Sequence, residues 1–208
     1  MIELEAGGRR VHVPVAAHAC QLSTTPSEAD HTARAFLRDG LRAGERCVAL
    51  LPRAAADDQC ANLISDGIDL DEAIHTHQLV VDMELDQRPS VGSFDPYGLA
   101  ARHLTDLAWS KLAGVTRLRI LVDMHWYAGP ASAAALLRYE ATCHAVMRQH
   151  AGRVVVLAQY RYGELPNDAV IDLLRLHPTT VVAHYIRRNP NPADPVTFMA
   201  RMLNRASA

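Results

Sequence analysis

Short apolar runs alternate with helical patterns along most of the chain. The apolar runs lie at 18–22, 47–51, 79–81, 118–122, 154–157 and 180–186. Residues with helical spacing of apolar positions fill the intervals, at 27–42, 54–65, 96–113, 132–150, 168–176 and 195–204. The runs are mostly apolar rather than strictly alternating, which is typical of strands buried on both faces. The pattern therefore predicts parallel strands joined by helices.

This alternation predicts an α/β fold with three layers, in which a mostly parallel central sheet is flanked by helices on both faces. Before the first buried run, apolar and polar residues alternate over 2–6 and 10–13 around Gly7-Gly8, which predicts an N-terminal hairpin. The 208 residues suit one hydrophobic core. We expect a single domain over 1–208, with a hairpin extension at 1–14 and an α/β core at 15–208.

Composition narrows the function classes. The net charge of −2 leaves no basic footprint for nucleic acid. No apolar run approaches the roughly 20 residues that span a bilayer, and the N-terminus lacks a signal pattern, so we expect a cytoplasmic protein without membrane contact. The four cysteines form no CxxC pair and are expected to be thiols, with Cys47 and Cys143 in the core.

Polar residues that follow three of the predicted strands are the candidates for a ligand site. Parallel α/β sheets bind ligands at the carboxyl ends of their strands, so we expect these residues to face one crevice. The candidates are His18, Cys20, Asp123, His125, Trp126, Gln159, Tyr160 and Arg161. No catalytic residue and no metal ligand is assigned, and the cofactor is unknown.

A nucleotide site is the main alternative, because the strand at 118–122 ends in Asp123 as a Walker B strand does. Its other half would be a glycine-rich loop with a lysine. The segment 21–28 has neither, and Lys111 is the only lysine in the chain. Hydrolysis of ATP by the usual machinery is therefore not expected, so we predict no enzyme activity. Weak nucleotide binding stays open, with Mg²⁺ on Asp123 and Arg53 or Arg161 in place of the lysine.

Two further chemistries are weighed and disfavoured. His18 and Cys20 with His125 or Asp123 could complete a tetrahedral metal site, but their spacing is not diagnostic. Cys20 could act as a nucleophile only with a base and an orienting group, which the sequence does not reveal.

Aromatic residues are scarce in the chain, but four members of a group of five flank predicted strand ends. They could wall an apolar pocket for a small organic ligand, or simply fill core space, and both interpretations stay open. The residues are Trp126, Tyr127, Tyr139, Tyr160 and Tyr162.

Several short motifs occur in an order that resembles the MEDS family of sensory domains, from about residue 18 to residue 203. The motifs are His18-Ala19-Cys20, the segment 36–46 (FLRDGLRAGER), Asp123-Met124-His125-Trp126, Tyr139-Glu140, Gln159-Tyr160, the segment 174–178 (LRLHP) and Asn189-Pro190. The chain departs from the family pattern at Asp123, where many members have Glu. It departs again at Ala158, where a cysteine commonly precedes the Gln-Tyr pair, and this weakens any cysteine-based mechanism.

The resemblance implies a divergent RecA/KaiC-like domain that senses a small organic ligand, either a hydrocarbon derivative or a one-carbon compound. It further implies a role in prokaryotic signal transduction or transcription control. These 208 residues carry no output module, so a separate partner is expected: a kinase, an anti-sigma factor or a transcription regulator. A homodimer stays open. His177-Pro178 also fits plain stabilisation of a helix C-terminus.

Overall fold

The computed structural model describes residues 2–6, 9–13, 18–82, 94–125, 133–150, 152–182 and 185–206, with the backbone alone at 2–13, 203, 205 and 206. The strands are β1 (Ile2–Ala6), β2 (Arg9–Val13), β3 (His18–Ser23), β4 (Arg46–Leu50), β5 (Leu79–Asp82), β6 (Leu118–Asp123), β7 (Val154–Arg161), β8 (Thr179–Val182) and β9 (Tyr185–Arg188). The helices are α1 (Pro26–Arg42), α2 (Arg53–Ser65), α3 (Leu70–His75), α4 (Pro96–Leu112), α6 (Ala133–Gln149), α7 (Asn167–Leu176) and α8 (Pro195–Ala206), with a 3-10 turn at Tyr162–Glu164.

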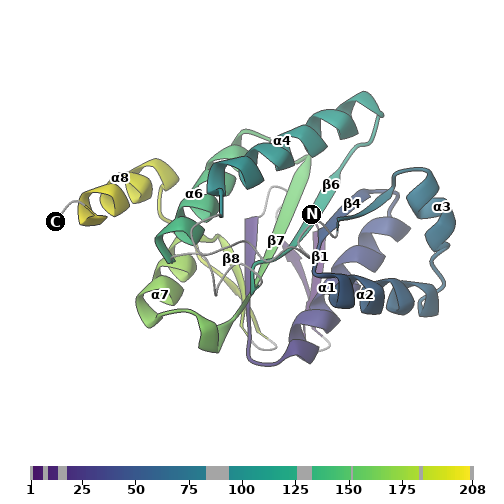
Figure 1. Cartoon of the computed structure of the whole chain (residues 1–208), viewed down its shortest axis with the longest axis horizontal. Coiled ribbons are helices and arrows are strands. Elements are labelled where there is room, and N and C mark those ends of the chain that lie inside the picture. The colour runs from purple at the N-terminus through teal and green to yellow at the C-terminus, as the bar shows by residue number, and fades with distance from the viewer. Residues whose placement is uncertain are drawn as a thin grey trace.

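The centre of the molecule is a seven-stranded sheet in the order β5-β4-β6-β7-β3-β8-β9. Neighbouring strands pair in parallel, except that β9 is antiparallel to β8. Helices lie on both sides of the sheet, with α1 and α2 on one side and α4 and α6 on the other (Figure 1). The predicted three-layer α/β fold is confirmed, and so is the N-terminal hairpin, since β1 pairs with β2.

Side-chain alternation along the strands separates two hydrophobic clusters. Ala19, Leu121 and Leu157 pack with α1 and α2 on one face, which we call the α1 face. Cys20 and Val156 pack with α4, α6 and α7 on the opposite face, which we call the α6 face. Consecutive residues of a strand therefore belong to different layers, and this governs where each polar side chain lies.

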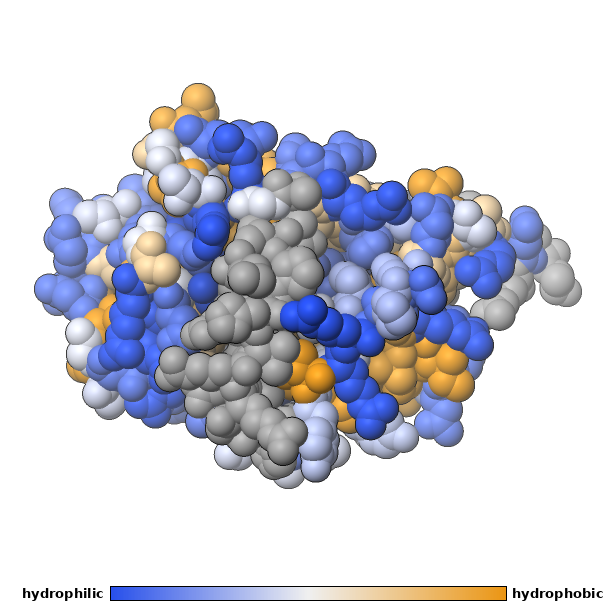
Figure 2. All heavy atoms as spheres, turned by 180° about the vertical axis from the view of Figure 1, so that it is seen from behind, coloured by the Kyte–Doolittle hydropathy of each residue, from blue (hydrophilic) through white to orange (hydrophobic). Residues whose placement is uncertain are grey.

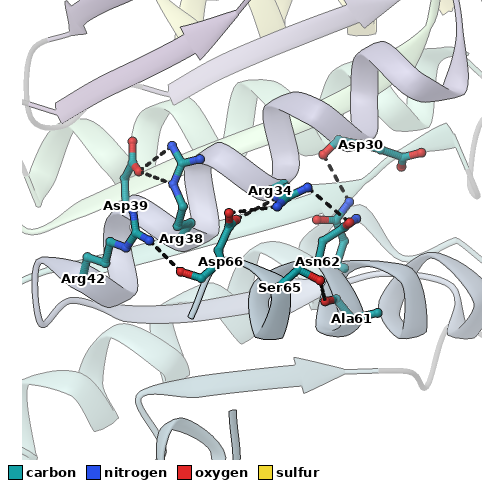
Figure 3. A network of polar contacts seen from close by, with 10 residues as sticks. Asp30, Arg34, Arg38, Asp39, Arg42, Ala61, Asn62, Ser65 and Asp66 are labelled. Atoms are coloured by element: carbon teal, nitrogen blue, oxygen red, sulfur yellow. Dashed lines mark hydrogen bonds and ion pairs between the residues drawn. The ribbon is translucent and has the colours of Figure 1, made fainter. Parts of the chain in front are cut away.

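Polar contacts join α1 to α2 on the outside of the α1 layer (Figure 3). The guanidinium of Arg34 donates to both carboxylate oxygens of Asp66, at 2.7 and 2.8 Å, and also to Asn62. Arg42 donates to the backbone oxygen of Asp66, and Gln59 donates to the backbone oxygen of Asp30. The bidentate pair fixes the angle between the two helices, which together form one wall of the site described below.

A buried ion pair lies beneath α1. Arg119 Nε of β6 is 2.5 Å from Glu45 Oε2, and Arg119 Nη1 donates to the backbone oxygen of Phe36. These contacts give the guanidinium partners in a residue that is only 4% exposed. Gly40 of α1 leaves room for this side chain, because a Cβ there would lie 2.7 Å from both Arg119 Cδ and Cys47 Sγ.

The expectations about elements hold with one correction. The strand predicted at 180–186 is two strands, β8 and β9, which turn back on each other. Helix α3 and the 3-10 turn were not expected. Cys47 and Cys143 are fully buried, as predicted. The single-domain boundaries stay a prediction.

The surface is largely hydrophilic in the view from behind, with apolar patches on the side of α7 and α8 and another at the opposite upper edge (Figure 2). In the described part of the chain, no helix has the length and apolar character needed to cross a membrane.

Candidate functional site

A small cavity opens at the carboxyl ends of β3, β4, β6 and β7, on the α1 face. We call it the crevice. Its volume is about 70 Å³, and its walls combine polar strand ends with the first turns of α1 and α2. The lining residues are Ser23, Pro26, Ala29, Asp30, Ala33, Leu51, Ala55, Gln59, Asp123, His125, Gln159, Tyr160 and Arg161. Five of the predicted site residues are among them.

A chain of amide hydrogen bonds forms the floor of the crevice. Gln159 Nε2 donates to Gln21 Oε1 at 2.7 Å and to the Ala29 backbone oxygen at 2.8 Å. Gln21 Nε2 donates in turn to Thr32 Oγ1 at 3.0 Å. Because both glutamine side chains are buried and their amide hydrogens are engaged, this floor is rigid.

Two carboxyl groups and an imidazole border the opening. Burial raises the pKa of Asp123, against the lowering effect of His125 and Arg161. Burial and the nearby Asp58 likewise raise the pKa of Asp30, with Arg161 opposing them. His125 Nδ1 contacts the Glu164 carboxylate. Carboxyl groups that are partly withdrawn from water are strong acceptors for a ligand O–H or N–H.

Helix α1 begins where a phosphate loop would lie in a nucleotide-binding protein. Its N-terminus is closed by its own side chains: Thr25 Oγ1 accepts from the Glu28 backbone N–H at 3.3 Å, and Glu28 Oε2 accepts from the Thr24 N–H at 2.8 Å. A carboxylate therefore takes the place that a phosphate would need.

The expectation that His18 and Cys20 face the crevice is wrong. His18 is the first residue of β3 and pairs with Val156 of β7. Gln159, which lines the crevice, lies three residues further along β7, roughly 10 Å nearer the carboxyl ends of the strands. The side chains of His18 and Cys20 are both fully buried on the α6 face. For the same reason they cannot form the weighed metal set with His125 or Asp123, which lie at the other end of the sheet.

Tyr160 borders the crevice, but its hydroxyl lies on the α6 face and donates to Glu140. Tyr139 is also fully buried there, and Tyr162 is exposed, so these three rings do not wall one pocket. Trp126 and Tyr127 lie outside the described residues.

A second polar group, which we call the buried triad, lies inside the α6 face and consists of His18, Glu140 and His177. All three side chains have 0% exposure. Glu140 Oε2 lies 2.8 Å from His18 Nε2 and 2.9 Å from His177 Nε2. Burial alone would raise the pKa of Glu140, but the two imidazoles outweigh it and hold that pKa below its usual value. Burial, together with His177, lowers the pKa of His18.

More titratable groups surround the buried triad. His103 Nε2 lies 2.8 Å from the Tyr139 hydroxyl, and burial lowers the pKa of His103 to about 3. Burial, with His18 and His177, lowers the pKa of His144 to about 4. Burial and Glu140 raise the pKa of Cys20 well above its usual value, so this thiol is a poor nucleophile.

Sequence reasoning missed the buried triad as a group. Tyr139-Glu140 and His177-Pro178 were noted as motifs, but nothing in their spacing along the chain brings them to His18. The one available signal was a glutamate within the apolar stripe of the helix at 132–150, since a carboxylate in such a place requires a partner.

The geometry defines an α/β domain with a small polar crevice at its strand ends and a buried His/Glu group behind the sheet. The chain belongs to the MEDS family (MEthanogen/methylotroph, DcmR Sensory domain), whose model matches residues 17–178. It is therefore a sensory domain, and the match spans both the crevice and the buried triad. No curated protein matches the chain.

Proposed function

We propose that this sensory domain binds a one-carbon or similarly small organic compound that carries a hydroxyl or amino group, and that the crevice is the binding site. The observation that carries the proposal is the crevice of about 70 Å³ bordered by Asp30 and Asp123. Drug-sized ligands occupy roughly 300–1,000 Å³, so a cavity of this size favours a ligand of a few heavy atoms.

The polar lining favours a hydrogen-bond donor over a plain hydrocarbon. Asp123 Oδ1 already accepts the His125 N–H at 3.0 Å, which leaves the second carboxylate oxygen for a ligand. Asp30 and Arg161 border the same space. A ligand O–H or N–H placed between the two carboxyl groups would gain a charge-assisted hydrogen bond.

The nucleotide alternative finds less support. The volume is far below that of a nucleotide pocket, and the Glu28 carboxylate caps the helix N-terminus that would otherwise receive phosphate. This supports a sensor without NTPase activity.

A sensor must transmit the bound state to an output. We therefore include in the proposal a separate partner protein: a kinase, an anti-sigma factor or a transcription regulator. Its affinity for this domain must differ between the free and ligand-bound states, because a ligand shifts an equilibrium only by its differential affinity. The crevice lies between α1, α2 and the ends of four strands, so a ligand there can change how the α1 layer packs on the sheet.

Thermal unfolding with methylammonium chloride and with methanol tests the proposal, with ammonium chloride as the ionic control. At a ligand concentration about 100 times Kd, binding to the folded state adds roughly 2.7 kcal/mol. For a chain of this length that raises Tm by roughly 5–10 °C.

The matched variants are Asp123→Asn in the crevice and Asp71→Asn on the exposed surface of α3. Asparagine keeps the oxygen that accepts the His125 N–H but removes the charge. We expect the Tm increase in the wild type and in Asp71→Asn, and its loss in Asp123→Asn. If neither probe raises Tm, or if Asp123→Asn responds like the wild type, the proposed site is wrong.

A further inference from the structure

The buried triad brings three metal-binding atoms together from three separate elements. One ligand atom each from His18 of β3, Glu140 of α6 and His177 at the end of α7 lies within 4.8 Å of the other two, and Glu140 Oε2 faces both Nε2 atoms. We infer that this triad is a binding site for one divalent transition-metal ion, either zinc or ferrous iron, held by two imidazoles and one carboxylate. The inference goes beyond the proposed function and does not depend on the crevice.

The hydrogen bonding of His177 supports a cation at this point. Its Nδ1 lies 2.8 Å from the Leu173 backbone oxygen, and a carbonyl can only accept, so Nδ1 carries the hydrogen. Nε2 then faces Glu140 Oε2 at 2.9 Å. Two lone pairs would oppose each other there unless a proton or a metal ion lies between them. A histidine that donates its other N–H to a backbone carbonyl is the usual arrangement of a metal ligand.

The surroundings of His18 are better explained by a metal ion than by a proton between His177 and Glu140. A proton shared by His177 and Glu140 does nothing for the second imidazole. Although His18 Nε2 is 2.8 Å from Glu140 Oε2, it is not directed along a hydrogen bond, and neither His18 nitrogen has a hydrogen-bond partner among the described residues. An unsatisfied buried group costs about 1–3 kcal/mol. A metal ion at the shared point would satisfy His18 Nε2.

The carboxylate is also oriented for this role. Tyr160 donates its hydroxyl hydrogen to Glu140 Oε1, which leaves Oε2 as the free ligand atom. Hydrogen bonds of this kind to the second carboxylate oxygen fix the geometry of metal sites.

Two imidazoles and one carboxylate suit zinc, or ferrous iron when further positions stay open. Because all three ligands are fully buried, the ion would be bound as the chain folds, and its binding energy would add to folding stability.

Metal analysis of the intact chain tests the inference. The protein is measured as purified, and again after unfolding with chelator and refolding with zinc sulfate or, without oxygen, ferrous sulfate. We expect about one equivalent of zinc or iron per chain. The variants are His18→Gln and His177→Gln. The matched control is His144→Gln, since the His144 ring lies 6.1 Å from that of His18 but outside the convergent set.

The inference predicts full metal content in the wild type and in His144→Gln, and a loss of at least tenfold in the two ligand variants with unchanged circular dichroism. Metal-free wild type after both refolding treatments would overturn it, and so would full metal content in His18→Gln and His177→Gln. If the ligand variants do not fold, X-ray absorption of the wild-type protein decides. Nitrogen and oxygen ligands at about 2.0–2.1 Å support the site, and a sulfur ligand at about 2.3 Å refutes it.

Discussion

Replacing Glu140 with glutamine tests how strongly the buried triad holds the fold together. The substitution keeps the shape of the side chain but removes the charge that two imidazoles and the Tyr160 hydroxyl share. Removing one partner of a fully buried ion pair lowers the free energy of unfolding by about 3–5 kcal/mol. At roughly 2–4 °C per kcal/mol for a chain of this length, we expect Tm to fall by about 6–20 °C.

The assay is calorimetric or circular-dichroism melting at neutral pH with chelator present, so that no metal ion contributes. The matched control is Glu72→Gln, the same chemical change at an exposed position in the first turn of α3, which should cost under about 1 kcal/mol. Tyr160→Phe is a milder probe, because it removes one hydrogen bond to the carboxylate and should cost about 1.5–3 kcal/mol. Equal melting of Glu140→Gln, Tyr160→Phe and the control would refute the energetic role of the buried triad.

Three further outcomes follow from burial. Alkylation of the native protein, measured by mass spectrometry, should modify Cys60 alone, because Cys20, Cys47 and Cys143 are buried. Early labelling of any of these three buried thiols would contradict their placement in the core. His103 stays neutral in the folded protein but takes up a proton when the chain unfolds, so stability should fall below pH 6.5. Urea titrations should show the wild type losing about 1.6 kcal/mol more than His103→Gln between pH 6.5 and 5, and equal losses would be inconsistent with a lowered pKa. In urea unfolding, Gly40→Ala should destabilise the protein by about 1–2 kcal/mol, because the new Cβ would press on Arg119. In the control Gly163→Ala, the new Cβ meets no atom within 4 Å, so stability should change by under about 0.5 kcal/mol. Similar values for the two variants would count against the tight contact at Gly40.

The layers of the fold follow directly from the hydrophobic pattern. Mostly apolar strands at 118–122 and 154–157 indicate a sheet covered on both faces, and Gly7-Gly8 indicates the hairpin. The run at 180–186 reads as one strand because it contains no glycine or proline, the residues that usually mark where one strand ends and the next begins.

The site was harder, because the sequence shows which residues are polar but not which layer each one enters. Gln159 and Tyr160 are neighbours in β7, yet one forms the floor of the crevice and the other bonds Glu140 on the opposite face. Strict alternation along β7 could have separated them. By contrast, His177 reaches Glu140 only through the packing of α7 on α6, which no local pattern encodes.

Binding of a small ligand in the crevice is the central proposal for this sensory domain. The most direct measurement is nuclear magnetic resonance of the ¹⁵N-labelled chain during titration with methylammonium and with methanol. If the ligand binds in the crevice, the largest amide shifts should cluster at the strand ends and the start of α1, around Ser23, Asp30, Asp123 and Arg161. An absence of shifts at saturating concentrations, or shifts centred on another part of the chain, would contradict this proposal.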